Sequence, residues 1–262
     1  MDGQLTVQAA TEPIPDEEAS VLQLMEPVTA SEGLVRVGTL AKSIAAGKHP
    51  PCLLIWRAHP ALVATGSEAR LAGFDRASAM LLASGWPVVT RKSGGGLFPV
   101  TPDTLQMAVL RRHEQGLSFD NVYDHLARTI IGALASMGLE GEVGEVPTGF
   151  CPGRYDIAIG GRKLAGLSQH WPADGSIIAE ASVLMGGDPH EFAAAVNCFH
   201  VETGSSRCCD PAAITSVAGE LDPFHPSPVA IVEMLSDAIC AVFRSESRPR
   251  MPNTMPPPRI VA

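Results

Sequence analysis

The sequence has no run of apolar residues close to the length of about 20 that crosses a bilayer. Its first residues, Met1-Asp2-Gly3-Gln4, lack the basic start and apolar core of a secretory signal. These two absences predict a cytoplasmic protein that does not bind membranes. A formal net charge of −9 also leaves no sign of the basic face that a general nucleic-acid binder needs, so we expect no nucleic-acid partner.

CxxC pairs are also absent, although the chain has six cysteines. Without a sign of secretion, we interpret these cysteines as reduced thiols rather than as a disulfide framework. His190, Cys198, His200, Cys208 and Cys209 lie near one another in the sequence, but their spacings match no standard zinc finger or ribbon. We therefore expect no metal site.

Both ends of the chain are rich in proline. Residues 1–20 are polar and acidic and contain Pro13 and Pro15, which predicts a mobile tail. Residues 247–262 carry a Pro256-Pro257-Pro258 run that suits neither a helix nor a ladder strand and predicts a second tail. No linker or internal repeat lies between them, so we expect residues 21–246 to form one domain.

Capping residues and glycines mark the ends of the expected helices. Three helices that each stop at a glycine are expected over 31–46, 75–84 and 118–137. Three further starts place a proline directly after a capping residue: Asp188-Pro189, Asp210-Pro211 and Ser227-Pro228.

Seven apolar runs predict strands: 52–56, 62–65, 87–91, 105–111, 155–159, 162–169 and 176–185. Gly160-Gly161 lies between two of these runs and predicts a two-residue hairpin. Residues 172–175 predict another tight turn. Hairpin-linked strands with helices before and after them predict an α+β fold, with a mixed, mainly antiparallel sheet flanked by helices.

Ser93-Gly94-Gly95-Gly96 is a loop whose backbone a ligand could approach closely. Its amides could cradle an anion or flank an acyl chain. The loop is not a P-loop, because no GK[ST] follows it, and it does not fit GxGxxG. The alternative is a flexible hairpin loop without a ligand.

Cys151 and Lys163 are the candidate reactive residues. A lone cysteine is more often a core residue, but Cys151 lies beside Pro152-Gly153 in a predicted turn, and Arg154, Arg162 and Lys163 are close in sequence. Nearby cations favour the thiolate form of a cysteine. Cys52 and Cys240 lie in apolar runs and are expected in the core. The alternative for Lys163 is an ordinary exposed strand lysine.

These segments together resemble the biotin/lipoate protein ligase superfamily over roughly residues 25–245. Arg91-Lys92-Ser93-Gly94-Gly95-Gly96 is similar to its arginine/serine/triple-glycine loop, and residues 161–169 are similar to its lysine strand. Glu32 and residues 60–66 also fit the family pattern. Lipoate ligases usually carry an Asn-Asp pair before the lysine strand. Here residues 150–156 instead resemble the cysteine-dependent octanoyltransferases, most of all the octanoyl-[glycine-cleavage H protein]:protein amidotransferase type.

The resemblance implies an acyltransferase with one acyl-binding tunnel and a cysteine thioester intermediate. Cys151 would attack an octanoyl or lipoyl carbonyl, and Lys163 would donate a hydrogen bond to that carbonyl. The implied donor is an octanoylated carrier, either the glycine-cleavage H protein or acyl-carrier protein, and the implied acceptor is a lysine of a lipoyl domain. No ATP, metal or other cofactor is required.

The resemblance also implies a set of substrate-binding residues: Arg91, Ser93, Gly94, Gly95, Gly96, Gly153, Arg154, Asp156 and Gly166. Carrier domains of this kind are commonly acidic, so an enzyme of net charge −9 needs a local basic patch. The candidates for this patch are Arg91, Lys92, Arg154 and Arg162.

Two other functions stay open at this point. One is an ATP-dependent lipoate–protein ligase, which Val100 disfavours because ligases tend to have histidine there. The other is a non-catalytic protein that binds lipoate or an acylated carrier in the same pocket. Residues 104–106 also depart from the Leu-Asn of many relatives and leave the pocket floor open.

Overall fold

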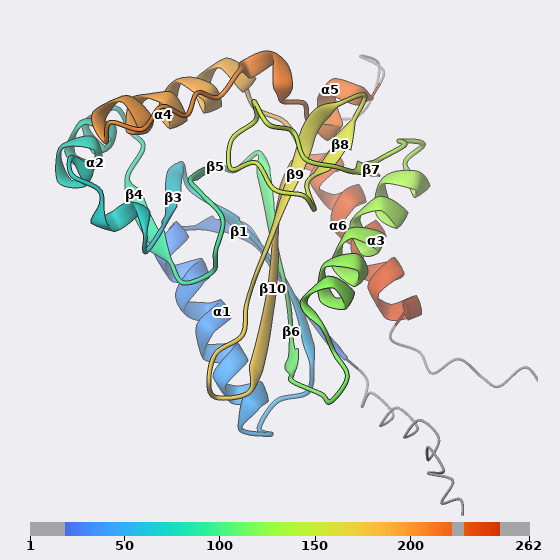
Figure 1. The fold of residues 1–262 in the computed structure, drawn as a ribbon. Helices are drawn as coiled ribbons and strands as arrows, with labels where there is room; N and C mark the ends of the chain where they lie inside the picture. The colour runs from blue at the N-terminus through green and yellow to red at the C-terminus, as the bar shows by residue number, and fades with distance from the viewer. Residues whose placement is uncertain (1–18, 222–227, 247–262) are drawn as a thin grey trace, which may run out of the picture.

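The computed structural model describes residues 19–221 and 228–246 (Figure 1). The N-terminal tail expected over residues 1–20 is wrong at its end, because Ser20 begins a strand. Residues 1–18 and the tail expected over 247–262 lie outside the described residues.

Seven strands form the large sheet, in the order β1-β2-β6-β10-β9-β8-β7. They are β1 (Ser20–Val28), β2 (Cys52–Ala58), β6 (Thr104–Arg112), β7 (Glu142–Val143), β8 (Ile157–Ile159), β9 (Arg162–His170) and β10 (Ser176–Leu184). Only β1 and β2 run parallel, and all other neighbours are antiparallel. The mixed, mainly antiparallel α+β fold expected from the sequence is confirmed.

A second sheet of three strands was not expected. It has the order β4-β3-β5 and consists of β3 (Ala61–Thr65), β4 (Val88–Arg91) and β5 (Phe98–Val100). The pairing of β3 with β4 is parallel, and that of β3 with β5 is antiparallel. Sequence patterns located β3 and β4 but could not show that they leave the main sheet, because a strand's partner is set by long-range packing.

Strands β1, β5 and β7 were missed, each for a physical reason. The edge strand β1 is partly exposed along most of its length and so has no clear apolar face. Strand β5 contains Pro99, which argues against a ladder strand. Strand β7 has only two residues and both are exposed.

The six α-helices of the described residues are α1 (Ala30–Ala45), α2 (Phe74–Ala83), α3 (Phe119–Ser136), α4 (Pro189–Glu202), α5 (Val217–Glu220) and α6 (Pro228–Glu246). Most expected ends are confirmed within one or two residues. The expected start at Asp210-Pro211 is wrong, because it opens only the 3₁₀ turn η2 (Pro211–Ala213). Ser227, expected to cap α6, lies outside the described residues.

Helices cover both faces of the large sheet (Figure 1). Helices α3 and α6 pack on one face, over a core that includes Leu53, Ile55 and Leu105. On the other face, α1 packs over Leu54 and Trp56 of β2. The small sheet lies with α2 and α4, which form a third hydrophobic cluster. Side chains of β2 therefore alternate between two cores, as expected of a buried strand.

Two glycines close the hairpin between β8 and β9. Gly160 and Gly161 have φ angles of +56° and +72°, which are the left-handed values that a type I′ turn needs at both central residues. This confirms the hairpin expected from the sequence. The hairpin fixes the register of β9, the strand that carries Lys163.

The N-terminal cap of α1 offers a test of the fold. The Thr29 hydroxyl accepts a hydrogen bond from the Glu32 N–H, and the Glu32 carboxylate accepts one from the Thr29 N–H at 2.9 Å. The cap predicted at Ser31 is therefore wrong, because the capping residue lies two positions earlier, at Thr29. We expect Thr29→Ala to lower the free energy of unfolding by about 1 kcal/mol in chemical denaturation.

Thr39→Ala is the matched control, because Thr39 is exposed on the same helix and its hydroxyl donates only to the Val35 carbonyl. We expect it to change the free energy of unfolding by no more than about 0.5 kcal/mol. Equal losses from the two variants would contradict the capping role of Thr29.

Candidate active site

A narrow cavity lies between the large sheet and the small sheet. Cys151 and Lys163 line one end, and Trp56 and Gln106 line the other. Most of its wall is apolar and includes Leu34 of α1, together with side chains of β3 and β5. The enclosed part holds only about 30 Å³, the space of about two waters. An apolar chain that entered it would have to push side chains aside.

Cys151 adopts an unusual backbone conformation at the mouth of this cavity. Its φ angle is +44°, and no other non-glycine residue of the described chain has a positive φ. This left-handed conformation costs about 1–2 kcal/mol for a residue with a side chain. The turn directs the Cys151 Sγ to the Gly96 N–H, which donates to it at 2.9 Å. Such strain is common at functional sites.

Gly95 lies against the same sulfur. A Cβ atom added at Gly95 would lie 3.1 Å from Cys151 Sγ and 3.0 Å from Arg91 Nη2, and the φ angle of +104° also favours glycine. The glycine at position 95 therefore lets this loop lie directly against the Cys151 thiol.

Lys163 is completely buried, so the alternative of an exposed strand lysine is wrong. Its Nζ lies 2.8 Å from the Phe150 carbonyl, 2.7 Å from the Cys151 carbonyl and 2.8 Å from Asp156 Oδ1. An ammonium has three N–H bonds, and these three partners use all of them. In this structure Lys163 therefore holds the backbone on both sides of the peptide that carries Cys151.

Asp156 completes this arrangement from the other side of the loop. Its Oδ2 accepts a hydrogen bond from the Gly153 N–H at 3.1 Å, while Oδ1 pairs with Lys163. Burial raises the pKa of the Asp156 carboxyl, and the Lys163 ammonium acts in the opposite direction by stabilising the carboxylate. The buried pair thus fixes residues 150–153 to β9.

Arg91 fixes the glycine loop in a similar way. Its Nη1 donates to Ser93 Oγ at 3.0 Å and to Ser168 Oγ at 2.6 Å, and its Nη2 donates to the Gly96 carbonyl at 3.2 Å. The Ser93 hydroxyl donates to Glu180 at 2.6 Å. Both expected loop residues are buried and serve to shape the loop.

Glu68 is a further residue of this site that sequence reasoning missed. Its Oε2 accepts hydrogen bonds from the N–H and hydroxyl of Thr65, and its Oε1 accepts one from the Leu97 N–H at 2.9 Å. The carboxylate thus anchors the residue next to Gly96. The Thr65-x-x-Glu68 spacing is a capping-box pattern that could have identified it.

Arg207 was also missed. A Cβ atom added at Gly96 would lie 3.2 Å from Arg207 Nη1. No sequence pattern links these two residues, because the chain returns to the loop only after α4.

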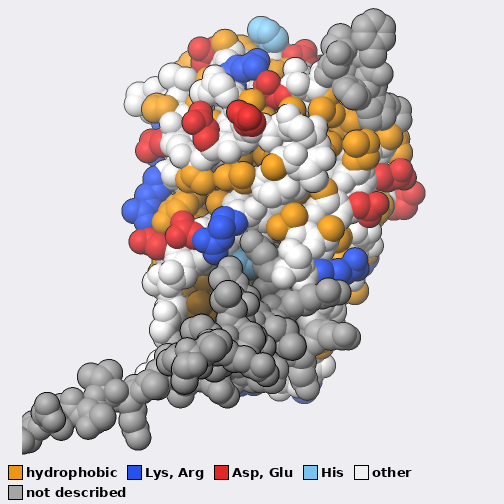
Figure 2. Space-filling view, turned by 90° about the vertical axis from the view of Figure 1, so that its right-hand side faces the viewer, with side chains coloured by type: hydrophobic (Ala, Val, Ile, Leu, Met, Phe, Trp, Pro, Cys, Tyr) orange, Lys and Arg blue, Asp and Glu red, His pale blue; other side chains and the backbone are white. Residues whose placement is uncertain are grey.

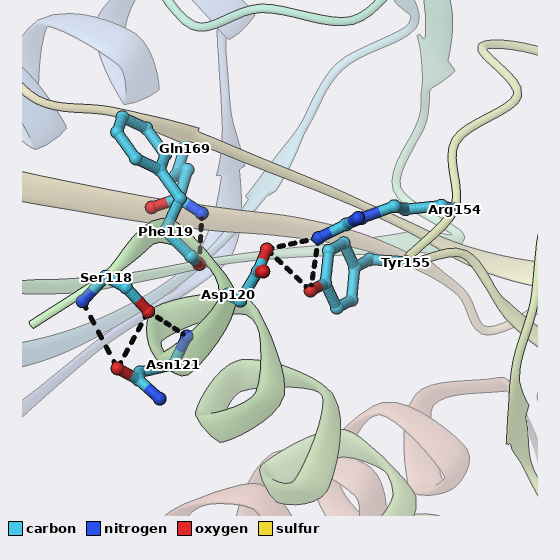
Figure 3. Close-up of polar contacts among 7 residues, drawn as sticks. All are labelled: Ser118, Phe119, Asp120, Asn121, Arg154, Tyr155 and Gln169. Atoms are coloured by element: carbon cyan, nitrogen blue, oxygen red, sulfur yellow. Dashed lines mark hydrogen bonds and ion pairs between the residues drawn. The ribbon is translucent and has the colours of Figure 1, made fainter.

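Arg154 does not point into the cavity. Figure 3 shows its guanidinium directed to Asp120 in the first turn of α3, where it forms an ion pair. It also donates to the Tyr155 hydroxyl at 2.9 Å, and that hydroxyl donates to Asp120 at 2.9 Å. Beside this group, Gln169 Nε2 donates to the Phe119 carbonyl at 2.8 Å (Figure 3). The expected substrate-binding role of Arg154 has no support in this geometry.

The basic patch expected from the sequence is wrong for Arg91 and stays a prediction for Lys92, Arg154 and Arg162. Arg91 is buried, and Arg154 and Arg162 are each paired with a carboxylate, the latter with Glu220 at 2.7 Å. Lys92 is exposed. On the face shown in Figure 2, the coloured Lys and Arg side chains lie dispersed among acidic and hydrophobic ones.

The structure thus brings together most of the residues expected at the site: Arg91, Ser93, Gly95, Gly96, Cys151, Gly153, Asp156, Lys163 and Gly166. Gly94 is exposed, and nothing lies within 4 Å of where its Cβ would be.

The other cysteines differ from Cys151 in their surroundings. Cys52 and Cys240 are buried in the core, as expected, and burial raises the pKa of both thiols. Burial raises the pKa of Cys209 to about 11, which leaves little thiolate at neutral pH. Neither of the remaining two, Cys198 and Cys208, lines the cavity.

Two classes of feature are absent from the part of the chain that the structure describes. Residues 19–221 and 228–246 contain no group of three or more His, Cys, Asp or Glu side chains placed to hold a metal ion. Among the helices of these same residues, none is long and apolar enough to span a membrane.

Comparison with known proteins supplies the family. The model of the lipoyl protein ligase A/B catalytic domain matches residues 37–243. A Kyrpidia tusciae protein named octanoyl-[GcvH]:protein N-octanoyltransferase is 29% identical over 202 residues, which are 73% of this chain and 69% of that protein. A Listeria monocytogenes protein named lipoyl-[GcvH]:protein N-lipoyltransferase is 28% identical over 171 residues, 64% of this chain and 61% of that protein.

Solved structures agree on the fold. A lipoate-protein ligase A bound with ATP superposes with a TM-score of 0.63 at 18% identity, covering 88% of this chain and 85% of that one. At this identity the likeness supports the shared fold alone.

The buried Lys163–Asp156 pair gives the prediction for this site. Asp156→Asn leaves the Lys163 ammonium buried without its counter-charge, so we expect the free energy of unfolding to fall by about 3–5 kcal/mol. Replacing both partners, as Asp156→Asn with Lys163→Met, removes the unpaired charge and is expected to restore part of that loss. Chemical denaturation of the two variants measures both effects.

Asp124→Asn on the exposed face of α3 is the control, with an expected change of no more than about 0.5 kcal/mol. A double variant less stable than the single one would contradict the expected cost of the unpaired charge, and would show that the bonds from Lys163 to the Phe150 and Cys151 carbonyls contribute more.

Proposed function

The chain belongs to the lipoyl protein ligase A/B catalytic-domain family, and we propose that it transfers an octanoyl or lipoyl group between carrier proteins through a thioester on Cys151. The observation that carries the proposal is the strained Cys151 turn. It directs a sulfur to a backbone N–H at the mouth of a mainly apolar cavity.

The first half of the reaction loads the enzyme. The Cys151 thiolate attacks the acyl carbonyl of the donor, and a carbon–sulfur bond forms. The bond from the carbonyl carbon to the donor then breaks. An amide donor leaves as an amine that takes up a proton, and a thioester donor leaves as a thiolate.

The second half unloads it. The neutral amine of a carrier lysine attacks the thioester carbonyl, a carbon–nitrogen bond forms and the bond to Cys151 Sγ breaks. The attacking nitrogen loses a proton, and Cys151 returns to its starting state. The reaction proposed here consumes no ATP and requires no metal.

Lys163 stabilises both tetrahedral intermediates in this proposal. Its ammonium lines the cavity beside Cys151, so negative charge on the acyl oxygen develops close to a buried cation. All three of its N–H bonds have partners in the ligand-free structure. One bond, to the Cys151 carbonyl, exchanges for the acyl oxygen when the substrate binds.

The carriers follow from the names of the relatives. The Kyrpidia and Listeria proteins are named for transfer from octanoylated or lipoylated GcvH to protein. We therefore propose an acylated GcvH, or an acyl-carrier protein, as donor and a lipoyl domain as acceptor. Lys92, next to the glycine loop in the chain, and Arg207, beside Gly96, are exposed cations with which an acidic carrier can pair.

A covalent intermediate is the central prediction of this mechanism. Incubation with octanoylated donor and no ATP is expected to add one octanoyl group to the protein, visible by intact mass and removed by hydroxylamine. Cys151→Ala should lose both this adduct and the transfer of octanoyl to a lipoyl domain. Cys208→Ala is the matched control and should keep both, since Cys208 lies outside the cavity.

Transfer by the Cys151→Ala protein at near the wild-type rate would overturn the proposed mechanism. Lipoate-dependent release of pyrophosphate from ATP would instead indicate a ligase. Saturable binding of the lipoyl group without turnover from any donor would indicate a non-catalytic protein.

A further inference from the structure

A row of four residues crosses the large sheet beneath the cavity. Gly166 of β9 pairs with Ser182 of β10, Ser182 with Gln106 of β6, and Gln106 with Trp56 of β2. All four line the same cavity as Cys151. Along the row the side chains change from none at Gly166 to an indole at Trp56, so the floor is open at one end and blocked at the other.

Gly166 marks the reactive end of this row. A Cβ atom added there would lie 3.3 Å from both Lys163 Cε and Nζ, so the ammonium lies over this glycine. The same Nζ is 2.7 Å from the Cys151 carbonyl. An acyl group attached to Cys151 therefore enters the cavity above β9.

The distance between neighbouring strands gives the distance from Gly166 to each residue of this row. Neighbouring strands lie about 4.8 Å apart, so Gln106 is about 10 Å and Trp56 about 14 Å from Gly166 across the sheet. A chain of C–C single bonds of about 1.5 Å advances by roughly 1.3 Å per carbon, so an octanoyl chain reaches about 9 Å from its carbonyl. Its last carbon lies over β6, short of β2. Apolar carbon atoms touch at a separation of about 4 Å, so the chain has about 10 Å before it meets the Trp56 indole, which is the reach of about nine carbons.

Trp56 is held firmly at the closed end. Its side chain is only 4% exposed and packs against α1. A Cβ atom added at Gly33 of α1 would lie 2.1 Å from the indole, so this helix position accommodates the ring only as glycine. Because the helix backbone at Gly33 lies against the ring, Trp56 cannot move toward α1.

Gln106, which lies next to Trp56 in this row, is also held in place. Its Nε2 donates to Thr104 Oγ1 at 2.9 Å and to Ser182 Oγ at 3.0 Å. Both N–H bonds of the amide are thus directed to neighbours in the sheet, which suits an apolar acyl tail above them.

We propose that Trp56, seated against Gly33, closes the acyl cavity and limits the transferred acyl group to about eight carbons. The inference rests on the proposed function and names the residue that sets its chain-length specificity. The substrate class is a straight acyl chain of octanoyl length, or a lipoyl group of similar reach.

The test compares donors of different length. Acyl-carrier-protein thioesters of six, eight, ten, twelve and fourteen carbons are given in turn to the full chain, and the Cys151 adduct is followed by intact mass. The wild-type protein is expected to prefer eight carbons and to react poorly with twelve. For Trp56→Ala, the rate with twelve carbons relative to that with eight should rise at least about tenfold, since a misfit of even one methylene changes rates by about 10–200-fold.

Gly33→Ala is expected to shorten the cavity, whereas Trp56→Ala is expected to lengthen it. The added methyl group displaces the indole toward the cavity, so the rate with eight carbons relative to six is expected to fall about tenfold. Trp86→Leu is the control: Trp86 packs against Phe192 outside the cavity and should leave the preference unchanged. Trp56→Phe provides a milder change should Trp56→Ala fail to fold.

The outcomes distinguish a failure of the proposed function from a failure of the role given to Trp56. A wild-type protein that forms no adduct with any donor overturns the proposed function, and the inference with it. A wild-type protein that prefers eight carbons, with the same preference in the Trp56 and Gly33 variants, overturns the inference alone.

Discussion

The buried ion pair between Lys163 and Asp156 is the interaction on which the candidate site depends. The ammonium binds the Phe150 and Cys151 carbonyls, and the carboxylate binds the Gly153 N–H. Together they hold a turn that strains Cys151, and this turn directs the thiol to the glycine loop. Burying two charges is costly unless each finds good partners. Here the same partners that stabilise the charges also position the sulfur.

The two sheets explain why Cys151 and Lys163 lie at the mainly apolar cavity. Strand β9 of the large sheet carries Lys163, while the glycine loop links β4 to β5 of the small sheet. Arg91, at the end of β4, joins the two by donating to Ser168 of β9 and to the Gly96 carbonyl. The cavity is the space that remains between the sheets, so its reactive end and its length are both set by strand pairing.

Local patterns predicted what local physics determines. The Gly160-Gly161 hairpin, the caps at Ser118 and Asp188 and the glycine loop were all recognisable, because each depends on a few adjacent residues. The small sheet, the burial of Arg91 and the approach of Arg207 to the loop were not, because they join segments far apart in the chain. Local sequence made Cys151 and Lys163 candidates, and the family resemblance implied their roles. Their hydrogen bonds needed the structure.

The structure of the protein after reaction with octanoylated donor tests the central claim most directly. The account predicts a thioester bond to Cys151 Sγ, a carbonyl oxygen within hydrogen-bonding distance of Lys163 Nζ, and an acyl chain that crosses β9 and β10 toward Gln106. An acyl group attached to any other residue, or a chain lying outside the cavity between the two sheets, would contradict it.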